Sequence, residues 1–347
     1  MKRIYVLHEN PEWISPLEQA FAAHKLPWQA WNLNNGAVFF EQEPPKGVFY
    51  NRMSASAHTR GNRFAPDLTF LTLNWLEKHG RRIINGSRAL QLELSKIEQY
   101  AALEEAGVKT PKTAAVVGKE NILSSIIRFT AAPFILKPNR GGKGAGVQLF
   151  YSIQQAQEFL NSPNYEEPVD GVWLIQEYIA SPEPFITRCE FIGGKFLYAA
   201  RVDTSDGFEL CPADACNLDA QQEKFRIVKH FERTHPELIK KYETFLRQNK
   251  IEAAGIEFIR NASGKIFTYD VNTNTNYNSL AESRAKVPKT GMEALAQFLG
   301  KELRKSSGPN HLLARPESTR SNSLAKKQKF ELRIGSRKPD HAQIRAA

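Results

Sequence analysis

The sequence predicts an α/β fold in which an N-terminal open α/β domain precedes two mixed units of strands and helices. Three observations support this prediction. Strand and helix patterns alternate over residues 1–90, a glycine-rich loop separates two strands after residue 137, and two acidic strands pair as a hairpin around residue 263. The chain has 347 residues, 41% of them hydrophobic, which is enough for two or three structural units.

The N-terminal domain, residues 1–90, opens with the strand pattern Lys2–Leu7. Glu12–Lys25 carries apolar residues at helical spacing, and Gly47–Tyr50 is a second apolar strand. That strand ends in the polar stretch 51–58. Because open α/β sheets bind ligands at the carboxyl ends of their strands, we expect this stretch to face a ligand.

Two further units follow, residues 91–180 and 181–305. In the first, the patterns predict a helix over Gln91–Ala106, a buried strand over Phe134–Leu136, a helix with the capping box Ser152 and Gln155, and a strand over Val172–Ile179. In the second, they predict the hairpin Glu190–Ile192 with Lys195–Val202, the helix Pro236–Asn249, the hairpin Gly255–Arg260 with Lys265–Val271, and the helix Met292–Leu303.

Residues 306–347 form a basic tail without sustained periodicity, which predicts disorder. Its nine Lys/Arg and three Asp/Glu give +6 of the net charge of +10, so residues 1–305 carry only +4. A nucleic-acid-binding protein acting through this tail is one alternative. Phe330 is its only aromatic residue, however, so base stacking would be nearly absent and we do not expect nucleic acid as a partner.

The composition also indicates the cellular compartment in which the protein is expected. Apolar runs such as 134–136 are far too short to span a membrane, and polar residues directly after Leu7 leave no signal-peptide segment. We therefore expect a cytoplasmic protein without a membrane partner; homo-oligomerisation is left open. Three cysteines, Cys189, Cys211 and Cys216, are too few for a disulfide framework and lack companion zinc ligands, so we expect reduced thiols.

The loop after the strand Phe134–Leu136 has the composition of a phosphate-binding flap. Four glycines leave its backbone free to wrap a polyphosphate with N–H groups: Gly141, Gly142, Gly144 and Gly146. Three cations accompany them: Lys137, Arg140 and Lys143. The loop lies between two strands and lacks the Gly-Lys-Ser/Thr of a Walker loop. An ordinary flexible hairpin is the alternative.

The predicted acidic hairpin brings three oxygen-bearing side chains together. Asp270 and Asn272 lie two residues apart and so share one strand face, while Glu257 lies on the paired strand. Two carboxylates and an amide oxygen make a hard site suited to Mg²⁺. Like carboxylates held close repel each other unless a cation lies between them, which favours this interpretation over a solvated hairpin face.

A third motif is the apolar strand that ends in Gln176 and Glu177. Such a strand end can offer main-chain groups and a carboxylate to adenine and ribose. Taken alone, an edge strand with a polar end explains these residues more simply.

In their order and spacing, these motifs resemble the ATP-grasp ligases, and most closely the RimK-like alpha-L-glutamate ligase branch, which is similar to glutathione synthetases. The resemblance covers residues 85–303 well and the first region loosely. It implies the ATP-grasp fold, in which two α+β subdomains sandwich ATP. The residues that carry it are Lys96, Lys137 with its flap, Gln176 to Ile179, Arg188, Glu257, Asp270 and Asn272.

The resemblance also implies roles for these residues. Lys96 and Lys137 would contact the ATP phosphates beneath the flap. The adenine pocket and the ribose site would use Gln176, Glu177, Tyr178, Ile179 and Glu183. The metal, Mg²⁺ with Mn²⁺ as an alternative, would use Glu257, Asp270 and Asn272. The catalytic residues facing an acylphosphate would be Arg188, Arg201 and Lys137.

Departures from the family pattern concern the substrates. Ile186 stands where the family has its ribose-binding acid, and Asp206–Asn217 replaces an Arg-Ser-Asn stretch near the acceptor end of the site. Asp270 also stands where Glu is commoner. The acceptor pocket is expected to combine residues 51–63, which include Arg52, His58, Arg60 and Arg63, with Arg188, Arg201, Asn274 and Asn276. These basic residues could hold a substrate carboxylate or simply form a solvated loop.

The function implied is ATP-dependent ligation of a carboxylate to an amine through an acylphosphate, with ADP and phosphate as products. Small molecules or peptides would supply both groups. The alternative is a protein that is not an enzyme, namely an ATP-binding regulatory protein without catalytic activity. The intact set of lysines and acidic residues argues against that alternative.

Overall fold

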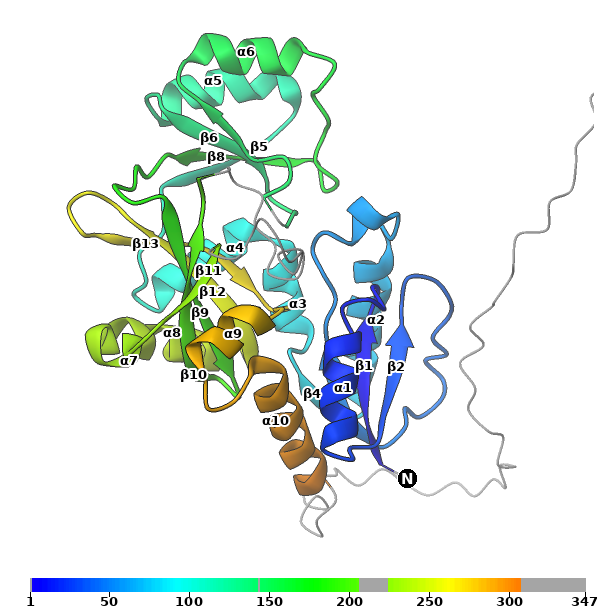
Figure 1. Ribbon diagram of the computed structural model, residues 1–347. Coiled ribbons are helices and arrows are strands. Elements are labelled where there is room, and N and C mark those ends of the chain that lie inside the picture. Colours follow the sequence, from blue (N-terminus) through cyan, green and yellow to red (C-terminus); the bar gives the residue numbers. More distant parts are fainter. Residues whose placement is uncertain (1, 143, 206–223, 307–347) are drawn as a thin grey trace, which may run out of the picture.

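The structure, a computed structural model, describes residues 2–142, 144–205 and 224–306 and confirms the α/β prediction (Figure 1). Some predictions concern positions outside these ranges: Lys143, Cys211, Cys216, the stretch Asp206–Asn217 and residues 307–347. Within the described ranges, no helix combines the length and the apolar character needed to cross a membrane.

The N-terminal domain contains a parallel four-stranded sheet. Its strands lie in the order β2 (Trp28–Asn32), β1 (Arg3–His8), β3 (Gly47–Asn51) and β4 (Arg82–Ile84). Side chains alternate across β1, so Ile4 and Val6 face α1 (Ser15–Ala23), whereas Tyr5 and Leu7 face α2 (Ala65–Lys78). A 3₁₀ turn, Ala57–Arg60, precedes α2.

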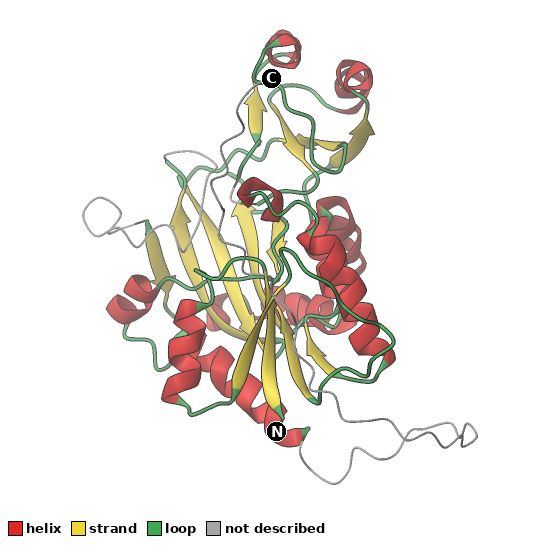
Figure 2. Ribbon diagram, turned by 90° about the vertical axis from the view of Figure 1, so that its right-hand side faces the viewer, coloured by secondary structure: helices red, strands yellow, loops and turns green. Residues whose placement is uncertain are grey.

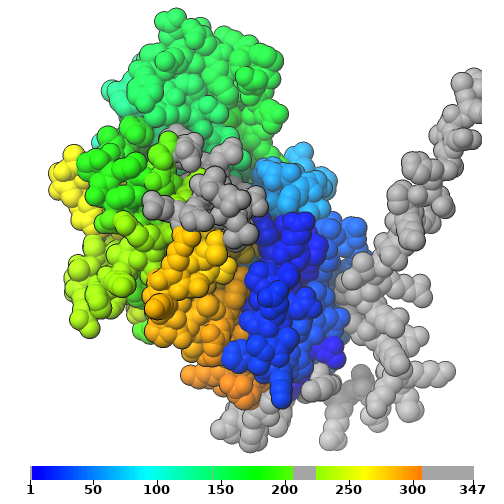
Figure 3. All heavy atoms as spheres, viewed as in Figure 1, coloured from blue at the N-terminus to red at the C-terminus, as the bar shows by residue number. Residues whose placement is uncertain are grey.

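The helix α10 (Gly291–Lys305) returns from the far end of the chain to the N-terminal domain. Leu295, Leu299 and Leu303 lie at helical spacing and pack into the same core as Ile4 and Val48. In Figures 1 and 3, α10 is accordingly seen beside the N-terminal domain. One face of the first sheet is therefore covered by residues about three hundred positions away in the sequence.

Within the second unit, residues 113–177 form the lobe at the top of Figure 1. Its antiparallel sheet has the order β5 (Thr113–Val117), β8 (Val172–Glu177), β6 (Phe134–Pro138) and β7 (Gln148–Phe150). Two helices cover it, α5 (Lys119–Phe129) and α6 (Ile153–Asn161). The predicted capping box is confirmed, because the Ser152 hydroxyl accepts a hydrogen bond from the Gln155 amide.

The third unit is built on a five-stranded antiparallel sheet, whose strands are seen in Figure 2. Its strands lie in the order β11 (Phe225–Val228), β10 (Lys195–Asp203), β9 (Phe185–Ile192), β12 (Ala253–Arg260) and β13 (Ile266–Asn272). Three helices also belong to this part of the chain: α7 (Phe231–Thr234), α8 (Pro236–Gln248) and α9 (Ser279–Ala285). Both predicted hairpins are confirmed, and Cys189 is a buried free thiol on β9.

The single helix predicted over Gln91–Ala106 is wrong: the segment forms α3 (Ser87–Leu94) and α4 (Lys96–Glu105). Ser95 between them adopts an extended conformation, and its hydroxyl accepts a hydrogen bond from the Glu98 amide. An N-cap residue has non-helical dihedral angles, so the cap interrupts the apolar periodicity. The break makes Lys96 the first residue of a helix.

Asn85 joins the N-terminal domain to the third unit. It is fully buried, and its positive φ of 57° places its amide between two other segments. The side-chain nitrogen donates to the carbonyls of Ala253 and Thr273 at 2.7 and 2.9 Å. The side-chain oxygen accepts from the amides of Glu252 and Ala253 at 2.9 and 3.2 Å. One side-chain amide thus forms hydrogen bonds with four main-chain groups, three of them buried.

Asn85→Ala should lower the free energy of unfolding by about 2–4 kcal/mol, because it leaves buried main-chain groups without partners. Asn85→Gly loses the same hydrogen bonds but tolerates positive φ, so the two variants separate hydrogen bonding from backbone strain. Urea unfolding followed by circular dichroism measures both. A loss below about 0.5 kcal/mol in both variants would contradict the role of Asn85.

Candidate functional site

A cavity of about 530 Å³ lies between the second and third units. Glycines of the β6–β7 loop, the end of β8 and the exposed face of the third sheet line it, with Trp13, Ser54 and Ser56 from the N-terminal domain. Most of the predicted site residues lie here: Lys96, Lys137, Gly141, Gly142, Gly144, Gln176, Glu177, Tyr178, Ile179, Glu183, Arg188, Glu257, Asp270 and Asn272.

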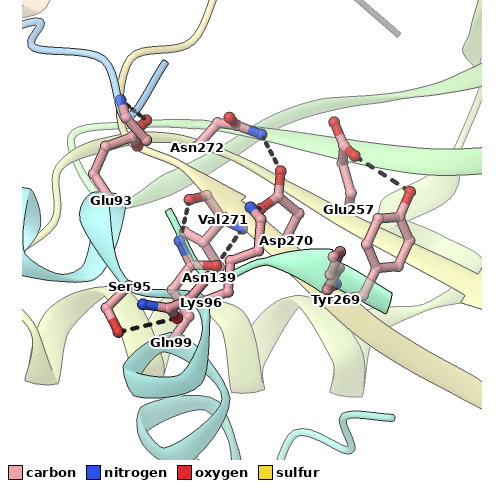
Figure 4. A network of polar contacts seen from close by, with 12 residues as sticks. Glu93, Ser95, Lys96, Gln99, Asn139, Glu257, Tyr269, Asp270, Val271 and Asn272 are labelled. Atoms are coloured by element: carbon pink, nitrogen blue, oxygen red, sulfur yellow. Dashed lines mark hydrogen bonds and ion pairs between the residues drawn. The ribbon is translucent and has the colours of Figure 1, made fainter. Parts of the chain in front are cut away.

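Strand register places the charged residues of the third sheet in one row. Arg188 on β9 is directly opposite Glu257 on β12, and Glu257 is opposite Asp270 on β13. Directly opposed residues in antiparallel strands share a face, so all three side chains point toward the cavity. Asn272 follows two residues after Asp270 on that face and donates to its carboxylate at 2.9 Å. The predicted grouping of the three oxygen-bearing side chains is therefore confirmed (Figure 4).

Each carboxylate of this row has a cation beside it, Arg188 of β9 for Glu257 and Lys96 of α4 for Asp270. Arg188 Nη1 lies 2.6 Å from Glu257 Oε1, and Lys96 Nζ lies 2.6 Å from Asp270 Oδ1. Burial raises the pKa of Glu257. Burial also opposes ionisation of Asp270, but the positive charges of Lys96, Lys137 and Arg188 together outweigh it and hold the pKa of Asp270 below its usual range. On the floor of the cavity, two adjacent carboxylates therefore lie between two cations.

A β-bulge brings Tyr269 to the same site. The β12–β13 register shifts between Glu257 and Phe258, and the additional residue on β13 is Tyr269. Its hydroxyl donates to Glu257 Oε2 at 3.3 Å (Figure 4). Regular alternation would place Tyr269 on the opposite face from Asp270, so the sequence pattern alone did not identify it.

Lys137 is almost completely buried beneath the flap. Its ammonium donates to the Tyr100 hydroxyl at 2.7 Å and to Gln176 Oε1 at 3.1 Å, and both partners are neutral. Burial lowers the pKa of Lys137 to about 7, and the positive charge of Lys96 acts in the same direction. The side chain of Gln176 thus supports Lys137, a role that the interpretation of Gln176 as an adenine-pocket residue did not include.

The glycines of the flap have the backbone freedom that the sequence analysis predicts. Gly144 and Gly146 adopt φ values of 78° and 74°. A Cβ on Gly146 would lie 3.0 Å from Pro138 Cγ, so a side chain there would crowd Pro138 as well as strain the backbone at this φ. Gly146 is not among the cavity-lining residues, and Gly142 approaches Ser56 of the N-terminal domain.

Residues at the end of β8 form the opposite wall. Tyr178, Ile179 and Glu183 line the cavity, as does Ile186. Glu177 also lines it, but its carboxylate accepts from the amide of Lys112 at 2.8 Å. Its side chain is therefore used to hold the strand end in place.

The prediction that Arg201 faces the site together with Arg188 is wrong. Arg201 on β10 is opposite Thr187 on β9, whereas Arg188 is opposite Ala200. Neighbouring residues on a strand point to opposite faces, so the two arginines lie on different sides of the sheet. The guanidinium of Arg201 lies 4.1 Å from the ring centroid of Phe185.

The basic loop of the N-terminal domain does not present its arginines to the cavity as predicted. Arg52 is fully buried, and Arg60 forms a 2.6 Å ion pair with Glu9. Arg63 donates to the carbonyl of Val169, and the ring of His58 contacts the carbonyl of Ala55. From this loop, Ser54 and Ser56 line the cavity instead.

Glu93 is a cavity residue that the motifs did not indicate. Its carboxylate accepts from the amide and the hydroxyl of Thr273 at 2.6 and 3.0 Å. Desolvation raises its pKa. Asn139 was also not predicted; its side chain accepts from the Ile97 amide at 3.1 Å and so links the flap to the start of α4. Both contacts join distant segments and have no local sequence signature.

The donors on the cavity floor suit a hard divalent cation. Among residues 2–142, 144–205 and 224–306, no three His, Cys, Asp or Glu side chains cluster as metal ligands. The predicted set therefore depends on the Asn272 amide oxygen as its third donor. Two carboxylates and one amide, all oxygen ligands, fit the preference of Mg²⁺.

The family model of the RimK-like ATP-grasp domain matches residues 94–287, more than half of the chain. The chain belongs to this RimK-like ATP-grasp family. The RimK-like chain is 27% identical over 135 residues to a probable alpha-L-glutamate ligase of Legionella pneumophila. The match covers 39% of this chain and 44% of that protein, so the chain spans less than half the length of this curated relative.

Two solved structures share the fold of this ATP-grasp chain. A RimK domain ATP-grasp protein from Sphaerobacter thermophilus has a TM-score of 0.60 at 16% identity, covering 85% of this chain and 98% of that one. The ATP-grasp ligase PsnB, solved with a minimal precursor, Mg and ADP, has a TM-score of 0.58 at 15% identity, covering 86% and 97%. The predicted ATP-grasp fold is thereby confirmed.

Lys137→Met should stabilise the fold most at low pH. The folded pKa of about 7 lies below the value of about 10.4 for an exposed lysine, so below pH 7 both states bind the proton and the burial penalty is complete. Between the two values the unfolded state binds more protons, and the penalty declines as pH rises. Urea unfolding at pH 6.5 and 9.5 should show a larger gain at pH 6.5.

The exposed Lys240 on α8 provides the matched control, because Lys240→Met removes an ammonium without relieving burial. Tyr100 and Gln176 keep their mutual hydrogen bond of 3.1 Å in Lys137→Met. A gain for Lys137→Met that is equal at both pH values would contradict the argument.

Proposed function

We propose that this protein is an ATP-dependent carboxylate–amine ligase that forms an amide bond through an acylphosphate, with ADP and phosphate as products. The observation that supports the proposal most strongly is the charged row Arg188–Glu257–Asp270–Lys96 on the cavity floor, with Lys137 buried beneath the glycine flap. Phosphoryl transfer needs positioning and charge neutralisation more than covalent help. This arrangement can supply both.

The position of each residue suggests its role. Lys96, Lys137 and the flap would hold the ATP phosphates, since they combine ammonium groups with a backbone that can approach closely. Tyr178, Ile179 and Glu183 would accept the adenosine. Glu257, Asp270 and Asn272 would hold Mg²⁺, with Mn²⁺ as an alternative. The bound metal would neutralise phosphate charge during transfer.

The chemistry would proceed in two displacements. An oxygen of the substrate carboxylate attacks the γ-phosphorus, the bond to the β-phosphate oxygen breaks, and ADP leaves. The amine nitrogen then attacks the acylphosphate carbonyl, phosphate leaves, and the nitrogen loses a proton. Arg188 lines the cavity beside Glu257 and would stabilise negative charge on the acylphosphate.

The relatives with the name probable alpha-L-glutamate ligase suggest amino acids or peptides as substrates. A screen of amino acids, dipeptides and a polyglutamate series for ADP release tests the proposal. Release that requires both a carboxylate and an amine supports a ligase. ATP binding without ADP release under any of these conditions would favour a regulatory protein instead.

Glu257→Gln or Asp270→Asn should abolish turnover and leave the fold intact, because each removes a negative charge from the proposed metal site. ADP release at saturating Mg²⁺ and the melting temperature are the measurements. Glu243→Gln is the matched control, since Glu243 forms an ion pair with Lys195 outside the cavity. Near-normal turnover in either cavity variant would refute the metal assignment.

Gly144→Val should lower turnover about 100-fold, equivalent to about 2.7 kcal/mol of transition-state stabilisation. A β-branched residue disfavours the φ of 78° and would crowd the phosphates. Adenosine binding, measured by calorimetry, should survive because Tyr178 and Ile179 belong to another element.

Gly80→Val tests whether strain alone could explain such a loss. Gly80 also has positive φ, at 61°, but it follows α2 in open space and does not line the cavity. The Gly80→Val variant should therefore have the same turnover as the unmodified protein. Equal losses in the two variants would show that the flap is only a hairpin.

A further inference from the structure

The guanidinium of Arg188 is held on three sides. Its side chain is only 6% exposed. Nε donates to Glu190 Oε1 at 2.6 Å, Nη1 to Glu257 Oε1 at 2.6 Å, and Nη2 to the Thr275 hydroxyl at 2.8 Å. The Thr275 hydroxyl in turn donates to Glu190 Oε2 at 2.8 Å. Each of the three nitrogens of the guanidinium therefore donates to one partner.

Gly255 creates the space in which this guanidinium lies. A Cβ on Gly255 would come within 2.2 Å of Arg188 Nη2 and 2.5 Å of its Cζ. Real side chains do not tolerate such contacts, so the guanidinium can lie across β12 only because Gly255 has no side chain.

The partners of Arg188 differ in their access to the cavity. Glu257 lines the cavity, whereas Glu190 and Thr275 do not and are buried. A cation bound at Glu257 would compete with Arg188 for that carboxylate. Glu190 would remain, so the buried guanidinium would keep a negative partner. A buried charge without a partner is strongly disfavoured.

Arg52 of the N-terminal domain fixes the segment that carries Thr275. Its guanidinium donates to Asn274 Oδ1 at 2.9 Å, to the Thr275 carbonyl at 3.1 Å and to Asn276 Oδ1 at 2.6 Å. A further bond, of 3.0 Å, reaches the carbonyl of Trp13. Contacts therefore run continuously from the N-terminal domain through Thr275 to Arg188.

We propose that Glu190 and Thr275, with Arg52 behind them, are positioning residues that fix the guanidinium of Arg188 in the cavity wall. The role of Arg188 in turnover rests on the proposed ligase function. The positioning itself rests on the contacts described above. Because the set includes Arg52, the N-terminal domain would contribute to the catalytic geometry of the third unit as well as to the lining of the cavity.

Thr275→Val removes the hydroxyl at nearly constant volume and should lower kcat about 10- to 100-fold, as expected for a misplaced catalytic group. KM for ATP should change less than about twofold, because the flap and adenosine wall are untouched. Thr275→Ser keeps the hydroxyl and should restore most of the activity. Glu190→Gln should also lower kcat, because it removes the enclosed negative charge.

Thr268→Val is the matched control. Thr268 is equally buried, and its hydroxyl bonds to Tyr242 at 2.6 Å, away from Arg188. Its kcat should stay within about twofold of the unmodified protein. The proposal is overturned if Thr275→Val keeps full kcat, if Thr268→Val loses as much, or if Thr275→Ser fails to restore activity.

A second measurement separates positioning from the ligase function. The Arg188 Nε–H proton, assigned by its loss in Arg188→Lys, should give a sharp nuclear magnetic resonance signal that exchanges slowly with water. Thr275→Val should broaden it or speed its exchange by about tenfold or more, whereas Thr268→Val should not. An unchanged signal in Thr275→Val overturns the positioning even if turnover falls. Absence of ADP release by the unmodified protein would refute the ligase function and leave this measurement decisive.

Discussion

The pairing register of β9, β12 and β13 is the constraint on which the site depends. It sets Arg188, Glu257 and Asp270 side by side on one face of the sheet. A shift of one residue in either pairing would turn a charged side chain into the apolar core on the other face. That core contains Cys189, Ile256 and Val271, the immediate neighbours of the three charged residues in the sequence. Packing on one face therefore holds the charges in place on the other.

The same physical rule explains which parts of the site could be predicted from the sequence. Asp270 and Asn272 are two residues apart on one strand, and a short turn fixes their partner strand, so local periodicity is sufficient. Arg188 and Arg201 lie on neighbouring strands, and whether they share a face depends on the register of the hairpin. Family resemblance assigns both to the site without establishing that register, and Arg201 was misplaced for this reason.

Other features depend on contacts between distant segments. Arg52 looks like a ligand-binding residue in the sequence because it follows a strand in a polar loop. Three of its four hydrogen-bond partners, on Asn274, Thr275 and Asn276, lie more than two hundred residues away, so its side chain connects two distant parts of the protein. Glu93 and Tyr269 were missed because one bonds a remote segment and the other depends on a bulge. The strands, the hairpins and the cap at Ser152 were easier to predict, since each is specified within about ten residues.

The packing of α10 on the first sheet has a consequence for how the chain folds during synthesis. Ile4 and Val48 leave the ribosome early, but Leu295, Leu299 and Leu303 of their shared core are made only after almost all of the described chain. One face of the N-terminal sheet must therefore stay partly uncovered while the ATP-grasp units are being translated. Exposed apolar surface of this kind promotes aggregation in nascent chains. The N-terminal domain can therefore complete this core only after α10 has been synthesised.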